Sequence, residues 1–195
     1  MKIIFATANK GKLREAAEIL GEGFELLSPA SLGITDDIEE TGDTLRDNSL
    51  IKADFIHART GMDCFADDTG LEVDALGGAP GVHSARYATE GHDFEANIDK
   101  LLSEMAKHPG EPRTARFRSV VTLVYGGQTH FFEGTLEGSI ALARRGANGF
   151  GYDPVFIPDC FPDRTVAELD DETKNAISHR GKALREMAEW LKANT

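Results

Sequence analysis

The first half of the chain alternates short apolar runs with longer segments in which apolar residues recur at helical spacing. Residues 2–6, "KIIFA", are apolar without alternation, which is typical of a strand buried on both faces. Leu13, Ala16, Ala17 and Leu20 then follow the three-to-four-residue period of a helix. This half therefore predicts strands at Lys2–Thr7, Phe24–Ser28, Met62–Ala66 and Leu71–Leu76, and helices at Gly11–Leu20, Thr44–Arg59 and Phe94–Lys107.

Glycines and capping residues set the expected ends of these helices. Gly21 and Gly23 end the first helix, whereas Asp43 is the expected N-cap of the second and Gly61 its stop. The two apolar runs on either side of "DDTG" are expected to be separate strands joined by a turn.

The second half has strand character first and a helix last. Thr114–Tyr125 and Thr129–Leu136 are joined by "GGQ", which predicts a β-hairpin, and Ser139–Ala143 is a further candidate strand. Gly181–Leu191 carries an apolar stripe and predicts the last helix. The pattern as a whole predicts a single α/β domain over residues 1–195, with a mixed central sheet flanked by helices.

Charge and cysteine usage narrow the function classes. The 21 Lys and Arg residues against 33 Asp and Glu give a net charge of -12, which disfavours a nucleic-acid-binding surface but allows a small phosphate ligand. Cys64 and Cys160 are expected to be buried thiols in a reducing compartment. The first apolar run is too short for a signal peptide or membrane span, so we expect a cytoplasmic protein without membrane contact.

The stretch "TANKGK", residues 7–12, places two lysines where a buried strand leads into a helix. The first amides of a helix lack internal partners and the helix dipole is positive there, so this arrangement favours an anion. Cations at this end oppose the dipole, and a residue choice made for stability alone would favour Asp or Glu. The alternative is a solvated helix turn.

Two acidic stretches are candidates for a metal site. "ADDTG" places Asp67 and Asp68 after an apolar strand, and "EETG" places Glu40 in an acidic loop. Neighbours in a strand point to opposite faces, so only one of the two aspartates can face a given site. Mg²⁺ prefers one or two carboxylates together with phosphate oxygens and water. An Asp-rich turn and a solvated loop are the alternatives.

Two further stretches carry candidate binding residues. In "KNAISHRGKALREM", the side chains of Lys174, His179 and Arg180 can converge only if the helix breaks before Ser178, a good N-cap. In "NGFGYDPVF", the rings of Phe150 and Tyr152 lie on a glycine-bracketed loop, which suits stacking against a base. A surface histidine and a small core under the loop are the respective alternatives.

Taken in order, "TANKGK", "EETG", "ADDTGLEVDALGGAPGVHSARYA", "GFGYDPVF" and "AISHRGKAL" resemble the inosine triphosphate pyrophosphatase family over nearly the whole chain. The resemblance implies an elongated α/β fold of two lobes that share one central sheet, with the active-site cleft between the lobes. It also implies a homodimer and a Mg²⁺ cofactor. The implied activity is the hydrolysis of noncanonical purine nucleoside triphosphates (ITP, dITP, XTP) to the monophosphate and pyrophosphate.

The resemblance also implies roles for individual residues. Glu40 and Asp68 would hold Mg²⁺, and Asp68 would be the catalytic base that prepares the attacking water. Substrate-binding residues would be Thr7, Ala8, Asn9, Lys10, Gly11, Lys12, Lys52, Thr69, Phe150, Gly151, Tyr152, Asp153, Lys174, His179 and Arg180. Within this set the first loop would grip the triphosphate, Phe150 would stack on the purine, and the last three would close over the base.

Two local variations and two other functions accompany this hypothesis. Many relatives have Gly in place of Ala8, and "DDTG" replaces the commoner "DDSG" while keeping the hydroxyl. An Arg fork reads the O6 and N7 of hypoxanthine favourably and meets the N6 donor of adenine unfavourably. The alternatives are a phosphomonoesterase with an Asp nucleophile and a non-catalytic nucleotide sensor.

Overall fold

The computed structural model describes residues 1–194, which form two compact units. Unit 1 comprises Met1–Asp68, Ser119–Gly134 and the residues from His179 on, and unit 2 comprises Thr69–Arg118 and Thr135–Ser178. The strand order is β2-β1-β3-β5-β6-β7, with β4 paired to β3, and both parallel and antiparallel pairs occur. The predicted α/β fold with a mixed sheet is therefore confirmed. The strands that run from one unit into the other are β3 (Cys64–Val73), β5 (Thr114–Tyr125) and β6 (Gln128–Ile140).

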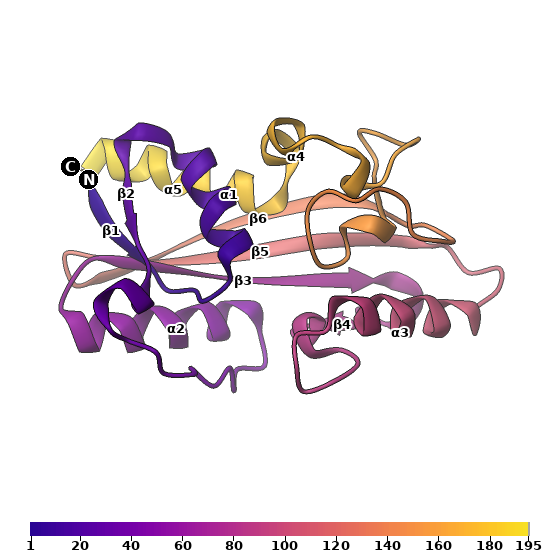
Figure 1. The fold of residues 1–195 in the computed structure, drawn as a ribbon, viewed down its shortest axis with the longest axis horizontal. Coiled ribbons are helices and arrows are strands. Elements are labelled where there is room, and N and C mark those ends of the chain that lie inside the picture. The colour runs from indigo at the N-terminus through magenta and orange to yellow at the C-terminus, as the bar shows by residue number, and fades with distance from the viewer. Residues whose placement is uncertain (195) are drawn as a thin grey trace. The chain divides into compact units, whose positions relative to one another are not determined.

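In unit 1, β1 (Lys2–Phe5) is buried on both faces, as its uninterrupted apolar run predicts. It pairs in parallel with β2 (Glu25–Leu27) and with β3. Figure 1 shows α1 and α5 on one side of β1 and α2 on the other. Ile3 and Phe5 belong to the core under α1 and α5, whereas Ile4 lies in the core under α2. The helices are α1 (Lys10–Leu20), α2 (Leu45–Thr60) and α5 (His179–Asn194).

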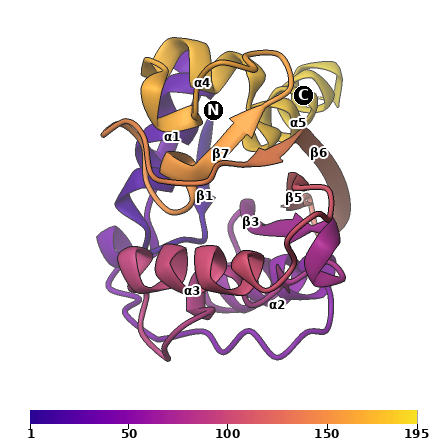
Figure 2. The ribbon, with the colours of Figure 1, turned by 90° about the vertical axis from the view of Figure 1, so that its right-hand side faces the viewer.

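In unit 2, one core cluster is built from β3, α3 and the chain around β7, with Leu71, Leu101 and Phe156 among its fully buried members. Figure 2 shows α3 and α4 on opposite sides of β7. The remaining elements are β4 (Pro80–Gly81), α3 (Phe94–Ala106), β7 (Phe156–Pro158) and α4 (Asp171–Ile177). Single 3-10 turns occur in both units, at Gly21–Gly23, Pro29–Leu32, Asp74–Leu76, Ser84–Arg86, Asp153–Val155 and Val166–Glu168.

The two strands predicted around "DDTG" are one continuous strand, so the expected turn is wrong. Pairing continues along β3, with Phe65 opposite Phe5 in the first part and Leu71 opposite Gly81 in the second. An Asp-rich turn is stabilised by hydrogen bonds from its carboxylates to nearby backbone N–H groups. Here Asp67 is paired with buried cations, so the backbone stays extended. Residues 74–76, expected at the end of a strand, form a 3-10 turn.

Three smaller expectations are also corrected. Thr44, and not Asp43, is the N-cap of α2, because its hydroxyl accepts the Asp47 N–H. The candidate strand at Ser139–Ala143 is the end of β6, which runs without a break to Ile140. Both cysteines are free, but only Cys64 is buried; Cys160 is exposed in the turn that follows β7.

The other long elements agree with the sequence pattern to within one to three residues at most of their ends. The hairpin between β5 and β6 turns at Gly126 and Gly127, whose positive φ values (55° and 77°) suit glycine. The helix break required before the last helix is present, since α4 ends at Ile177 and α5 begins at His179. No helix within residues 1–194 is long and apolar enough to cross a membrane.

Candidate functional site

The opening loop of unit 1 is closed by its own asparagine. Asn9 is the N-cap of α1, and its Oδ1 accepts the N–H groups of Gly11 (2.9 Å) and Lys12 (3.2 Å). The Asn9 N–H in turn donates to the Thr7 hydroxyl (3.1 Å). Two of the amides expected to bind an anion are thus already satisfied by the cap. The remaining anion-binding capacity comes from side chains, of which Lys10 is exposed at the first position of α1.

Lys12 takes part in a buried charge network that the sequence did not predict. Its Nζ donates to Asp67 Oδ1 (2.9 Å), and Arg180 Nε donates to Asp67 Oδ2 (2.8 Å). The Nη1 of Arg180 donates to Glu15, one turn along α1 from Lys12. Glu15, Asp67 and Arg180 are each less than 5% exposed. The network therefore ties α1, β3 and α5 together within unit 1.

Burial and charge act against each other in this network. Burial alone would raise the pKa of Asp67, but Lys12 and Arg180 hold that pKa well below its usual range. Burial lowers the pKa of Lys12, even though Asp67 opposes this shift. For Arg180, burial would lower the pKa, but Asp67 and Glu15 outweigh it and raise the pKa. Asp67 is consequently a fixed anion that holds two cations.

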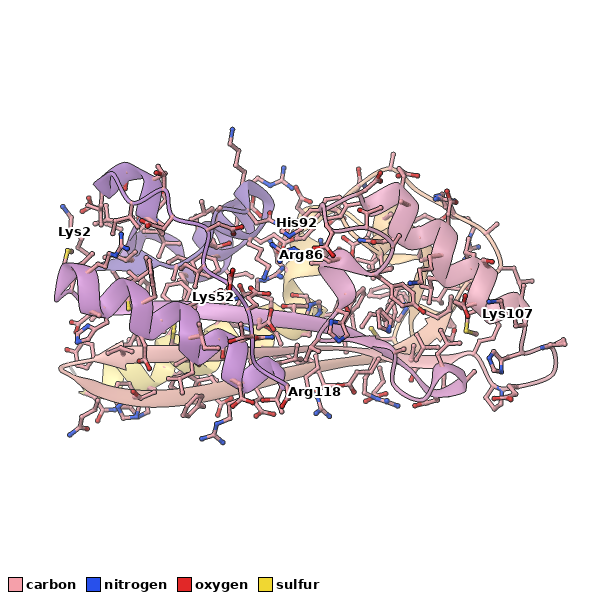
Figure 3. All side chains as sticks on the ribbon, turned by 90° about the horizontal axis from the view of Figure 1, so that it is seen from below. Lys2, Lys52, Arg86, His92, Lys107 and Arg118 are labelled. Carbon is pink, nitrogen blue, oxygen red and sulfur yellow. The ribbon has the colours of Figure 1, made fainter. Side chains whose placement is uncertain are left out.

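The second part of the unit 1 site is centred on Lys52, which projects from α2 (Figure 3). Its Nζ lies 2.6 Å from Glu40 Oε1 and 3.4 Å from Asp68 Oδ1. Burial would lower the pKa of Lys52, but the carboxylates of Asp68 and Glu40 outweigh this and raise it. Lys52 is therefore a charged group held between two acidic side chains, one from the acidic loop and one from β3.

Asp68 is the member of this group whose charged form is least favourably buried. Burial raises the pKa of its carboxyl, and Glu40 and Asp67 add to the rise, although Lys52 and Lys12 oppose it. Its Oδ2 is buried and has no hydrogen-bond partner among the described residues. A buried carboxylate oxygen without a partner is costly unless a ligand completes it. A divalent cation on Asp68 and Glu40 suits this arrangement, because hard oxygen donors are what Mg²⁺ prefers.

Unit 2 holds a separate cluster, here called the unit 2 cluster: Phe94, Phe150, Asp153 and Lys174. The Lys174 Nζ donates to Asp153 Oδ2 (2.6 Å) and lies 4.6 Å from the centre of the Phe150 ring. The same Oδ2 accepts the Phe150 N–H (3.0 Å), which fixes the loop. Lys174 and Asp153 are both 5% exposed, whereas Phe150 is only partly buried.

Two neighbours of Phe150 explain how the loop is formed. A Cβ at Gly149 would lie 2.1 Å from Asp153 Oδ2, and the φ of Gly149 is +73°, so only glycine is suited to this position. The ring of Phe94, itself 37% exposed, lies 6.1 Å from that of Phe150. The cluster thus presents an aromatic surface beside an ammonium group.

Tyr152 does not share this exposure. It is 6% exposed, belongs to the unit 2 core, and its hydroxyl donates to the Ser84 carbonyl (2.7 Å). Burial raises the pKa of this phenol, which therefore stays protonated at neutral pH. For Tyr152 the small core under the loop is the correct alternative, whereas the side chain of Phe150 is only partly buried.

The structure distributes the predicted site residues between the two units. Unit 1 brings together Lys12, Lys52 and Asp68 with Glu40, and holds Thr7, Ala8, Asn9, Lys10, Gly11, His179 and Arg180. Unit 2 contains Thr69, Phe150, Gly151, Tyr152, Asp153 and Lys174. His179 is 6% exposed at the start of α5. Arg180 lies on Asp67 and Glu15, not in the free position expected of a side chain that reads a base, so its part in base recognition stays a prediction.

Sequence reasoning missed Glu15, the network role of Asp67, Asn48 and Phe94. A signal existed for the first: Glu15 follows Lys12 by three residues, so both lie on one face of α1. Asn48 precedes Lys52 by four residues in α2, and both are buried. No pattern pointed to Phe94, because a single aromatic residue at the start of a helix carries no partner information.

Comparisons with known proteins agree on one family. The model of the Ham1 family matches residues 3–190. The dITP/XTP pyrophosphatase of Porphyromonas gingivalis is 51% identical over 97% of each chain, and that of Christiangramia forsetii is 49% identical over 98% of this chain and 99% of its own. The structure of a HAM1 protein from Coxiella burnetii aligns over 99% of both chains with a TM-score of 0.90 and 38% identity.

Proposed function

The chain belongs to the Ham1 family, and from this premise we propose that it hydrolyses noncanonical purine nucleoside triphosphates such as dITP, ITP and XTP. The products are the nucleoside monophosphate and pyrophosphate, and the effect is to remove deaminated purines from the nucleotide pool. Relatives named dITP/XTP pyrophosphatase support the substrate class. One observation in this chain carries the proposal furthest: the buried Asp68, with a raised pKa and an unpartnered oxygen, lies beside two lysines and a second carboxylate.

In this mechanism Asp68 is the general base. Water attacks the α-phosphorus, the bond from the α-phosphorus to the bridging oxygen breaks, and pyrophosphate leaves with the bond's electron pair. The proton of the water passes to Asp68. A carboxylate positioned next to the attacking water accepts its proton as the new bond forms, and such proton transfer contributes on the order of 10²–10⁴ in rate.

The cations of unit 1 neutralise the phosphates. Lys10 is exposed and free to approach an anion, while Lys12 and Lys52 are already ordered by carboxylates. Phosphoryl transfer depends mainly on positioning and on charge stabilisation, so pre-ordered lysines lower the barrier without reorganising. Because Arg180 also holds Asp67, this carboxylate does not depend on Lys12 alone for a partner.

We propose Mg²⁺ as the cofactor, with Glu40 and Asp68 as its protein ligands. When bound, the ion neutralises charge on the phosphate oxygens. The unpartnered Oδ2 of Asp68 supports this assignment. Assembly as a homodimer, which rests on the family resemblance, and a cytoplasmic location are further parts of the proposal.

The unit 2 cluster is proposed to take the base. Phe150 offers a partly exposed ring for stacking, and Lys174 is a buried donor beside that ring. Hypoxanthine and xanthine present an O6 acceptor where adenine presents an N6 donor, so an ammonium group favours the deaminated bases. Asp153 accepts a hydrogen bond from Lys174 and so fixes the ammonium group beside the ring.

Product analysis tests the proposal. The purified protein is incubated with Mg²⁺ and dITP, ITP, XTP, GTP or ATP, and pyrophosphate and orthophosphate are measured separately. We expect pyrophosphate with the first three and little product with ATP. Orthophosphate from ITP would favour a phosphomonoesterase, and tight binding of Mg–ITP without turnover would favour a sensor.

A further inference from the structure

The acidic loop that carries Glu40 has almost no backbone support of its own. Residues 34–42 contain no regular secondary structure. Among the described residues, the backbone of residues 35–42 makes one hydrogen bond, from the Gly42 N–H to Asn48 Oδ1, at 2.7 Å. Side chains hold the rest of the loop: Asp36 pairs with Arg59, Glu40 pairs with Lys52, and Ile34 and Ile38 pack against the core under α2. The Gly42–Asn48 contact is thus the loop's backbone hydrogen bond next to Glu40.

The position of Asn48 in α2 suits it to accept the Gly42 N–H. It is 2% exposed and lies in the first turns of α2, four residues before Lys52. Residues four apart lie on the same face of a helix, so one face of α2 presents both the acceptor for the loop and the ammonium group that Glu40 contacts. Buried polar side chains are almost always hydrogen-bonded, and the Gly42 N–H supplies this bond to the Asn48 amide oxygen.

Gly42 fits the same contact for a steric reason. A Cβ on this residue would lie 2.5 Å from Asp47 Cβ and 2.8 Å from Asn48 Oδ1. The φ of Gly42 is not positive, so glycine is required here for space and not for an unusual backbone conformation. The absence of a side chain lets the loop lie directly on the first turn of α2.

We infer that Asn48 is a positioning residue that sets Glu40 for metal binding, through its hydrogen bond to Gly42. This inference rests on the proposed function, because it takes Glu40 as a metal ligand. Two attachments, Asn48 to the backbone at Gly42 and Lys52 to the side chain of Glu40, together define where the carboxylate lies. Groups that orient a metal ligand in this way are typically worth 10–100-fold in metal affinity or activity.

The test compares Asn48→Leu, which keeps the volume but removes the acceptor, with Asn48→Asp, which retains an oxygen at the same position. The matched control is Asn97→Leu. Asn97 is 1% exposed, lies in α3 of unit 2, and accepts the Ala88 N–H at 2.8 Å. Its Nδ2 also donates to the Ser84 and Ala85 carbonyls, so Asn97→Leu is the more severe loss of loop-holding bonds, at a residue whose hydrogen-bond partners belong to unit 2, whereas Glu40 belongs to unit 1.

Three measurements are made on each variant. They are the Mg²⁺ concentration for half-maximal ITP hydrolysis, the affinity for Mn²⁺ without substrate by electron paramagnetic resonance, and the hydrogen-exchange rate of the Gly42 amide by NMR. In Asn48→Leu we expect fast exchange at Gly42 and both metal constants weakened about 10–100-fold, with turnover largely restored by excess Mg²⁺. Asn48→Asp should stay close to the wild type in exchange, and Asn97→Leu should leave both metal constants unchanged.

Unchanged metal constants in Asn48→Leu, together with fast exchange at Gly42, would overturn the inference while leaving the proposed function intact. A wild-type protein that neither binds Mn²⁺ nor needs Mg²⁺ would instead contradict the proposed metal site. If Asn48→Leu does not fold, Asn48→Ala removes the same acceptor without adding a branched side chain. The same metal constants and the same exchange rate at Gly42 then test the inference.

Discussion

The Nζ of Lys12 lies 2.9 Å from Oδ1 of Asp67, a residue 55 positions later in the chain. Asp67 is 1% exposed, and its other oxygen accepts a hydrogen bond from Arg180. The first of the two adjacent aspartates is thus a structural anion. The second, Asp68, keeps an unpartnered oxygen. Neighbours on a strand point to opposite faces. Here one face carries the buried ion pairs of Asp67, and the other carries the proposed metal ligand Asp68.

The first prediction concerns Asp67 and stability. Asp67→Asn leaves the charges of Lys12 and Arg180 buried without their shared anion, so we expect the free energy of unfolding at pH 7 to fall by about 3–5 kcal/mol. Urea denaturation measures this loss. The control is Asp74→Asn, because Asp74 pairs with Arg116 at the surface and should contribute much less. Equal, small losses in both variants would contradict the anchoring role.

The second prediction is the pH dependence of the same contribution. The folded-state pKa of Asp67 lies below its unfolded value of about 3.9. A depressed carboxyl pKa stabilises the fold above the unfolded pKa, and this contribution is lost as the pH falls toward the folded pKa. The stability difference between wild type and Asp67→Asn should therefore be constant from about pH 5 to 7 and shrink below about pH 4. Urea titrations at several pH values follow it.

The third prediction concerns Asp68, where activity and stability should move in opposite directions. Asp68→Asn should lower turnover of ITP at least ~10²-fold, because the general base is removed. Burial raises the pKa of Asp68, so its ionised form destabilises the metal-free fold at neutral pH. The variant should accordingly have a higher Tm without metal, and Mg²⁺ should raise the Tm of the wild type only.

Both halves of that prediction are measurable on the same samples, by kinetics and by thermal unfolding with and without Mg²⁺. Near-wild-type turnover in Asp68→Asn would remove Asp68 from the role of base. A lower Tm in the metal-free variant would show instead that the contact of Asp68 with Lys52 outweighs the cost of burying its charge.

Much of the fold could be predicted because local patterns and burial agree. The apolar run of β1 and the apolar stripe of α1 each indicate which residues face the core. The continuity of β3 could not be predicted, because it depends on Lys12 and Arg180, which lie 55 residues before and 113 residues after Asp67. A charge in an apolar run suggests a turn until its distant partners are known.

The same limit applies to the candidate site. Asp68 and Glu40 could be proposed from residue type, since carboxylates near lysines suit a metal and a phosphate. That Lys52 contacts both of them required the fold. The hydrogen bond from the Gly42 N–H to Asn48 could not be predicted either. The sequence pattern around a single asparagine in a helix does not show whether its side chain is a buried acceptor or lies at the surface.

The fourth prediction separates the two lysines of the opening loop. Lys10→Ala and Lys12→Ala should each weaken triphosphate binding by about 1.5–3 kcal/mol, and weaken binding of the monophosphate far less. Only Lys12→Ala should also destabilise the fold, because it leaves Asp67 with one cation fewer. Calorimetric titration with Mg–ITP and IMP, paired with thermal unfolding, measures both effects. Equal losses for the two nucleotides would place the lysines away from the outer phosphates.

The last prediction concerns the choice of base. Arg180→Ala should reduce the ratio of ITP to ATP hydrolysis if Arg180 reads the base, but it also strips two buried carboxylates of their partner, so a loss of folding would obscure the result. Lys174 is the sharper test. Its ammonium group lies over Phe150 and should donate to O6. Lys174→Met should therefore lower kcat/KM for ITP roughly tenfold or more and leave that for ATP nearly unchanged.

Phe150→Ala provides the contrast that makes the ratio interpretable. Every base has a π-face, so loss of the ring should weaken ITP and ATP by a similar factor, about 1–3 kcal/mol each, and leave their ratio unchanged. Lys174→Met also removes a partner of Asp153, so the Phe150 loop could shift. If loop displacement were the cause, both substrates would be affected equally, as in Phe150→Ala. An ITP-to-ATP ratio that stays at its wild-type value in Lys174→Met therefore places base selection on another residue.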